Sequence, residues 1–194
     1  LEINEGRIDA DTFGAGRAGS IFIAGNSLSL NDSSIQSSPR EGSSGKAGAV
    51  DIAIANDILI ENAEISIANN AVKSDLYSIS PAAIIISAKN LFMTEGGIRS
   101  DSSGNLPAGN IILGIKDGLY LNSGSAISTV ANNADGGVIN IGDGKKIFIQ
   151  NSAITTSVYG QSGNGGDIAI TANGLILDSG FVQANTAASG ASGG

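Results

Sequence analysis

The chain of 194 residues carries a formal net charge of −8 and contains no cysteine, histidine or tryptophan. An acidic chain without a basic stripe cannot neutralise phosphates, which argues against nucleic acid and against an anionic membrane surface as partners. The lack of cysteine excludes both a disulfide framework and thiol chemistry. No apolar run approaches the roughly 18 residues of a membrane-spanning helix, so we expect no insertion into a membrane.

One apolar pattern recurs along the chain at intervals of 27 to 34 residues. Each unit opens with a small residue followed by two apolar residues two positions apart, at 19–23, 48–52, 82–86, 109–113, 137–141 and 166–170. A second alternating pair and then a single apolar residue follow, and in the first complete unit these are Leu28, Leu30 and Ile35. Residues 1–8 supply an incomplete unit at the front. Short alternating segments indicate strands, and their long-period repetition is typical of a solenoid.

Three kinds of connection separate the expected strands. Asn or Asp, which tolerate left-handed backbone, marks the first turn at Asn26, Asn56, Asn90, Asp117 and Asn173. The second turn has two polar residues followed by a small one, as in Thr94-Glu95-Gly96. The third connection is longer, with 12 to 19 residues, and it contains all three prolines. Since proline cannot donate to a strand ladder, its restriction to this connection supports the assignment of the strands.

The pattern predicts an all-β fold, namely a parallel β-helix of about seven whole or partial coils with three short strands in each coil. Equivalent strands of successive coils would pair about 4.8 Å apart. Leucine-rich repeats would need a fixed Asn after the strand, and propeller blades would need four strands and aromatic anchors. We therefore expect residues 1–194 to form a single β-helical segment. Because neither end resembles a cap, we expect it to be an uncapped fragment of a longer repeat protein.

The units resemble the repeats of the filamentous haemagglutinin family, and the clearest example is GNGGDIAITANGLILDSGFVQANT at 163–186. Members of this family are large exoproteins of two-partner secretion systems, and the sequence pattern of the repeat is similar to the patterns found in cyanobacterial members. The resemblance covers the whole chain and implies a right-handed β-helix, export through an outer-membrane secretion partner and a role in surface adhesion. The NPNG- and NPNL-type motifs of the family's secretion domain do not occur in this sequence, so the function of that domain is not carried over.

Residues for catalysis or metal binding are not expected. Glycan-cleaving β-helices need clustered acids, and the nearest pair, Asp32 and Glu61, is one position out of register in the same turn of adjacent coils. GNGGDI at 163–168 lacks the nonapeptide spacing of calcium-binding β-rolls, and GDGKK at 142–146 lacks the spacing of a phosphate loop. We therefore expect no enzymatic activity, no cofactor and no metal site.

The expected function is that of a non-enzymatic, structural and adhesive segment of a large secreted or cell-surface exoprotein of a Gram-negative-type bacterium. Its partners would be the outer-membrane secretion protein and a host-cell or surface receptor, either glycan or protein, and the segment would be a monomer. The alternative is a β-helix that binds or cleaves polysaccharide. Long loops on rigid scaffolds carry recognition residues, so the longest connection supplies the predicted interaction residues, Lys73, Asp75, Leu76 and Tyr77.

Overall fold

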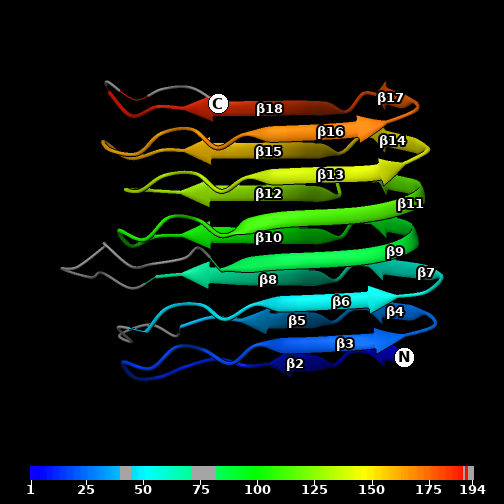
Figure 1. Cartoon of the computed structure of the whole chain (residues 1–194), viewed down its shortest axis with the longest axis horizontal. Helices are drawn as coiled ribbons and strands as arrows, with labels where there is room; N and C mark the ends of the chain where they lie inside the picture. Colours follow the sequence, from blue (N-terminus) through cyan, green and yellow to red (C-terminus); the bar gives the residue numbers. More distant parts are fainter. Residues whose placement is uncertain (40–44, 71–81, 190, 192–194) are drawn as a thin grey trace.

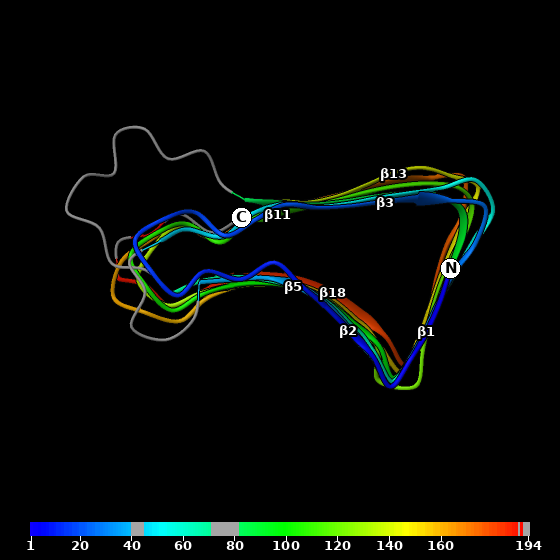
Figure 2. The same ribbon diagram turned by 90° about the horizontal axis from the view of Figure 1, so that it is seen from below.

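The computed structural model describes residues 1–39, 45–70, 82–189 and 191, which form eighteen strands and no helix. After a partial turn at the N-terminus, the chain winds through six complete turns of a parallel β-solenoid, as the sequence predicts. The strands nearest the viewer in Figure 1 run to the right while the chain climbs from its N-terminus, so the coil is right-handed. Figure 2 looks along the stack and shows three strand-bearing faces, with the third connections on the opposite side.

The three parts of the repeat become the three faces of the coil. The first face holds β3 (Ile21–Gly25), β6 (Val50–Ile54), the first half of β9 (Ala83–Thr94), the first half of β11 (Asn110–Asn122), β13 (Ile139–Gly144) and β16 (Ile168–Ala172). The second face holds β1 (Glu2–Asn4), β4 (Leu28–Asn31), β7 (Asp57–Glu61), the second halves of β9 and β11, β14 (Lys146–Gln150) and β17 (Leu175–Asp178). The third face holds β2 (Arg7–Asp9), β5 (Ser34–Ser37), β8 (Glu64–Asn69), β10 (Gly97–Ser102), β12 (Ala126–Ala131), β15 (Ala153–Val158) and β18 (Phe181–Thr186).

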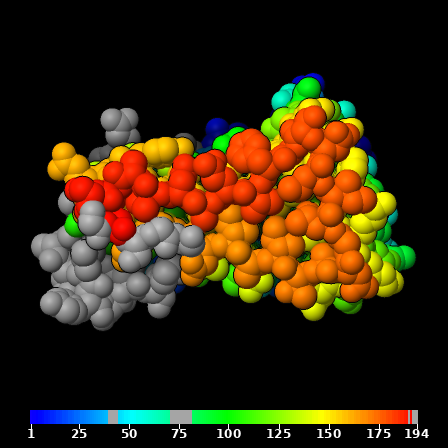
Figure 3. All heavy atoms as spheres, turned by 90° about the horizontal axis from the view of Figure 1, so that it is seen from above, coloured from blue at the N-terminus to red at the C-terminus, as the bar shows by residue number. Residues whose placement is uncertain are grey.

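The apolar residues of the repeat point inward and stack on their equivalents. Ile141 pairs with Leu113 below and with Ile170 above, and its side chain is fully buried. The same holds on the third face, where Ile98 pairs with Ile65 and Ile127. Aliphatic and β-branched residues dominate this core because in-register stacking places like on like in a narrow interior. The last coil has a neighbour on one side only, and its residues form the surface seen in Figure 3.

Two coils depart from the predicted three short strands. β9 and β11 run without a break from the first face to the second, with 12 and 13 residues. In β11 the bend is taken up by a register shift between Ile115 and Gly118. Ala88 and Ile115 point into the core at this bend, so the ladder continues around the first turn. A bulge can turn a strand in this way without ending it.

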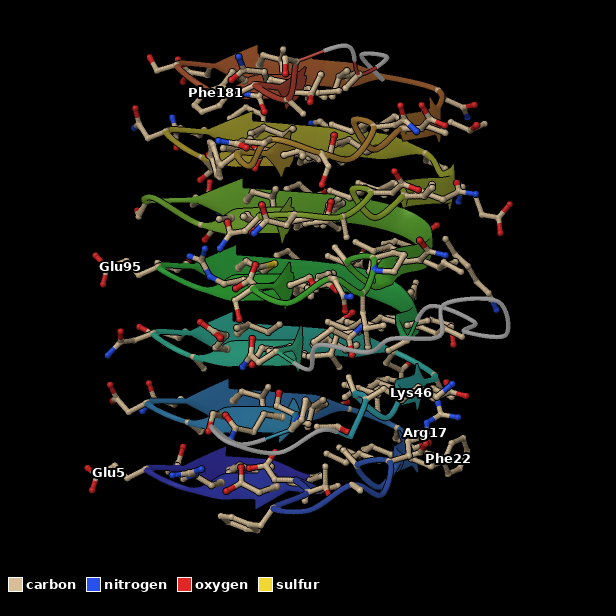
Figure 4. The ribbon with its side chains drawn as sticks, turned by 90° about the vertical axis from the view of Figure 1, so that its left-hand side faces the viewer. Glu5, Arg17, Phe22, Lys46, Glu95 and Phe181 are labelled. Carbon is tan, nitrogen blue, oxygen red and sulfur yellow. The ribbon has the colours of Figure 1, made fainter. Side chains whose placement is uncertain are left out.

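Seven of the eight non-glycine residues with positive φ lie at the second turn, and only Asp143, with a φ of 65°, lies at the first turn where we expected such backbone in the described residues. The middle residue of every second turn has a positive φ of 46° to 55°, and these residues are Glu5, Asp32, Asn62, Glu95, Ser123, Asn151 and Ser179. Figure 4 shows Glu5 and Glu95 projecting from this turn into solvent. Among the Asx residues of the first turn, Asn90 instead donates from Nδ2 to Asp57 Oδ1 at 2.8 Å, one coil below. At this position the first turn links two coils through side chains, whereas the second turn uses left-handed backbone in every coil.

In three coils a side-chain hydroxyl group closes the coil where the third face approaches the first, whereas the same column holds Ile67 and the unbonded hydroxyl of Ser100 in the two coils between. Ser37, Thr129 and Thr156 donate to the carbonyl oxygens of Gly19, Gly137 and Gly166 at 2.6, 3.0 and 2.7 Å. Gly48, Gly109, Gly137 and Gly166 open first-face strands and are required by this close approach, since a Cβ on Gly48 would lie 2.0 Å from the carbonyl oxygen of Gly19, whereas Ala82 takes the same place in the third complete coil. We call this column the neck. It separates the main core from the third connections.

Candidate interaction surface

The loop residues predicted from the sequence are not placed by the structure. Lys73, Asp75, Leu76 and Tyr77 fall in the segment 71–81, outside the described residues. Their role in recognition stays a prediction.

The predicted acid pair lies where the sequence placed it. Glu61 pairs with Asn31 across adjacent coils, and Asp32 is one position further along, where it accepts a hydrogen bond from Asn62 Nδ2. No group of three or more acidic, cysteine or histidine side chains suited to a metal ion occurs among the described residues. Within the same ranges, no helix is long and apolar enough to cross a membrane.

The second face carries a surface feature that the sequence analysis missed. The middle, outward residue of each second pair is large and apolar in five successive coils, and strand pairing places these residues side by side. We call them the aromatic ribbon, and its members are Leu59, Phe92, Tyr120, Phe148 and Ile176. The triplets LFM, LYL and IFI at 91–93, 119–121 and 147–149 contain the signal, because only their first and third residues are needed for the core.

The centre of the ribbon is ordered by ring stacking. The rings of Phe92 and Tyr120 are 4.9 Å apart between centroids and 6° from parallel. The Tyr120 ring lies along its own strand over Gly118, since a Cβ there would be 2.4 Å from Cε2 and 2.7 Å from the hydroxyl oxygen. Offset stacks of this kind add about 1 kcal/mol beyond the area they bury. At the lower end of the ribbon Leu59 is 48% exposed, and at the upper end Ile176 is 44% exposed.

Polar side chains border the ribbon along both edges. Two residues after each ring come Thr94, Asn122 and Gln150. Thr94 and Asn122 pair in register, and Gln150 is the last residue of β14. Two residues before each ring come Asn90, Gly118 and Lys146, which also pair in register, so on this edge the polar side chains of Asn90 and Lys146 lie on either side of a glycine. Successive residues of a strand alternate between its faces, so both polar columns share the outer surface with the rings.

Lysine residues gather at the first turn beside the ribbon. Lys89, Lys116, Lys145 and Lys146 come from three consecutive coils, and all four are exposed. Asp117 lies among them, with Lys145 Nζ 2.7 Å from its Oδ1 and Lys89 Nζ 3.8 Å from its Oδ2. The hydrogen bond from Lys145 holds the pKa of the Asp117 carboxyl below its usual value. The other acids of this turn are Asp143 and, one coil below Lys89, Asp57, so four lysines face three carboxylates and the local charge is positive although the chain as a whole is acidic.

A second cluster of charged groups lies on the third face. Arg99 Nε is 3.4 Å from Glu64 Oε2, and Asp101 follows on the same strand as Arg99. Burial raises the pKa of the Asp101 carboxyl, Arg99 opposes this effect and Glu64 adds to it. Glu64 and Asp101 line a hollow of about 280 Å³ together with Gln36 and Ser66.

The fold places the chain among the parallel β-helical repeat proteins. No family model matches the sequence, and comparisons with curated proteins and with solved structures find no similar protein.

Proposed function

We propose that this chain is a structural and adhesive segment of a large secreted, cell-surface exoprotein without enzymatic activity of its own. The observation that supports this role is the unbroken stack of coils, in which seven third-face strands pair in one continuous ladder. Such a stack can be lengthened by adding coils without changing any existing contact. A protein built in this way is suited to hold a binding region at a distance from a surface.

The composition and the repeat support the same proposal. A cysteine-free chain has no thiols to mispair during passage across a cell envelope, and a net charge of −8 keeps a strand-rich molecule soluble by mutual repulsion. The resemblance of the repeat to filamentous haemagglutinins also supports a secretion route, namely export through an outer-membrane partner of a Gram-negative-type bacterium.

Surface labelling tests this proposal. Antibodies raised against the folded chain should label intact cells of the source organism, and brief protease treatment of those cells should remove the label. Labelling that requires lysis of the cells would contradict the proposed location. A periplasmic or cytosolic marker protein, unlabelled in intact cells, is the control.

A second candidate function is cleavage of polysaccharide, and the specific observation in its favour is the pair of acids on the third face. Glycosidases place a carboxyl of raised pKa near a second carboxylate, and Asp101 with Glu64 has this character. Incubation with a panel of plant and bacterial polysaccharides would decide between the two. Turnover that Asp101→Asn abolishes would establish the enzyme, and the absence of turnover by the parent chain would leave the structural role.

A further inference from the structure

The aromatic ribbon repeats with the period of the coil. Each coil contributes one large apolar side chain at its centre, and in-register pairing carries the row from Leu59 to Ile176 along the stacking axis. A surface that repeats by translation complements a ligand that also repeats by translation. A linear polymer lying along the stack would meet equivalent groups at each step, whereas a compact ligand would use one step only.

The chemistry across the ribbon is that of a carbohydrate site. Aromatic rings pack against the apolar C–H faces of sugar rings, and hydroxyl and amide groups bond to sugar hydroxyls. In the three central coils the rings are Phe92, Tyr120 and Phe148, and the side chains of Thr94, Asn122 and Gln150 border them. Tyr120 adds a hydroxyl group whose oxygen lies over Gly118.

The charge beside the ribbon selects an anionic polymer. Lys89 and Lys145 both approach Asp117 and are partly neutralised by it. Among the described residues, no carboxylate lies within ion-pair distance of Lys116 or Lys146. Lys146 pairs in register with Gly118, the residue that the Tyr120 ring covers, so it lies in the column that borders the centre of the ribbon. A chain with a net charge of −8 repels polyanions at long range, so a local cluster of lysines is the place where one could bind.

From this combination we infer that the second face binds a linear anionic polysaccharide along the aromatic ribbon. The sugar rings pack on Phe92, Tyr120 and Phe148, and their acidic groups face Lys116 and Lys146. This inference names the ligand class of the adhesive function proposed above and rests on it. The surface-labelling result and the binding result are nevertheless independent, because one concerns location and the other a purified chain.

Binding to two forms of one polymer tests the inference. Polygalacturonate and its fully methyl-esterified form share the sugar backbone and differ in charge, so calorimetry with both separates ring packing from charge. The parent chain should bind polygalacturonate more tightly than the ester. Tyr120→Ala should weaken binding of both forms by about tenfold, as expected for the loss of a central aromatic anchor. Lys146→Gln should weaken only polygalacturonate and reduce the salt dependence of its binding.

Matched controls lie elsewhere on the molecule. Phe22→Ala removes a ring that is 70% exposed on the first face, and Lys46→Gln removes one positive charge next to Arg17, on the side of the third connections (Figure 4). Both should bind both polymers as the parent does. Lys146 is exposed, so its replacement leaves the fold intact even if Tyr120→Ala does not fold, and circular dichroism checks both variants.

Three results would overturn the inference. The first is no binding of polygalacturonate by the parent chain, and the second is binding that Lys146→Gln and Tyr120→Ala leave unchanged. The third is a concentration-dependent dimer in sedimentation experiments that Tyr120→Ala dissociates, because the ribbon would then be covered by a second copy of the chain.

Discussion

Inward residues of the strands fix the register of the whole stack, and Ile141 is a direct test of it. Ile141→Asp would bury a carboxylate between Leu113 and Ile170 with no cationic partner. A buried unpaired charge costs about 4 kcal/mol, so chemical denaturation should show a large loss of unfolding free energy or no folded state. Asn140→Asp introduces the same group one residue earlier, on the exposed outer surface. If the two variants unfold at the same denaturant concentration, Ile141 does not lie in the core.

Asp101, the half-buried acid of the third face, gives stability a pH dependence of defined sign. Because the pKa of Asp101 is raised in the folded state, the folded chain binds more protons than the unfolded chain between the usual and the raised pKa. This group therefore makes stability fall as the pH rises through that window, and the loss persists at neutral pH.

Asp101→Asn removes this titration. The melting temperature of the variant should exceed that of the parent at pH 7, and the difference should shrink at a pH below the usual pKa of aspartate, where the parent carboxyl is protonated in both states. Asp51→Asn, on the first face, changes the net charge equally and serves as the control. If Asp101→Asn raises the melting temperature by the same amount at both pH values, the pKa of Asp101 is not raised by folding.

Single positions also show where reasoning from sequence ends. Ile141 could be assigned to the core because apolar residues two apart occupy one face of a strand. The left-handed positions could not be assigned from residue type, since Glu95 and Ser123 adopt this backbone while Asn56 and Asn90 do not. At the second turn the geometry of the coil determines the backbone conformation, because the chain must change direction there between the second-face and third-face strands, whose apolar side chains both point inward.

At the scale of elements, the neck joins the third face to the first through hydroxyl groups. Thr156→Val keeps the shape of the side chain but removes the donor to Gly166 O, a buried hydrogen bond of 2.7 Å. We expect a loss of about 1 kcal/mol, measured as a lower denaturation midpoint. Thr155→Val, at the adjacent outward position, should change the midpoint by much less. Equal effects would mean that the neck hydroxyl is not a structural contact.

The aromatic ribbon also belongs to this scale, and it explains why the candidate site was missed. Phe92, Tyr120 and Phe148 are 28 residues apart in sequence, and each alone is one outward-facing ring in a chain with few aromatic residues. Only the pairing of β9, β11 and β14 makes them neighbours. The strands themselves could be predicted from their alternation, but outward positions carry no such signal, because either a polar or an apolar residue is compatible with the fold.

The whole molecule is a stack in which each coil pairs only with the coils next to it. Deleting residues 111–138, one full period, would join Asn110 to Ile139 and let Ile139 pair with Ile84, the present partner of Ile111. The shortened chain should fold, with a strand-rich circular dichroism spectrum and a modestly lower melting temperature. Deleting 111–124 removes half a period and should prevent folding, because the third-face strand β12 would follow Asn110 directly and that coil would lose its first-face and second-face strands. Similar behaviour of the two deletions would contradict nearest-neighbour stacking.

The direction of the ladder also determines how such a segment responds to tension. The interstrand hydrogen bonds run along the stacking axis, and only one neighbour holds the outermost coil. A pull on the two ends of the chain therefore detaches coils one after another from the ends of the stack. The repeat of 28 residues between Ile111 and Ile139 adds about 4.8 Å to the folded stack but spans roughly 95 Å when extended. With the surface location proposed above, this segment would lengthen stepwise under drag and rewind at rest, and force spectroscopy on a tethered chain should record steps of that size.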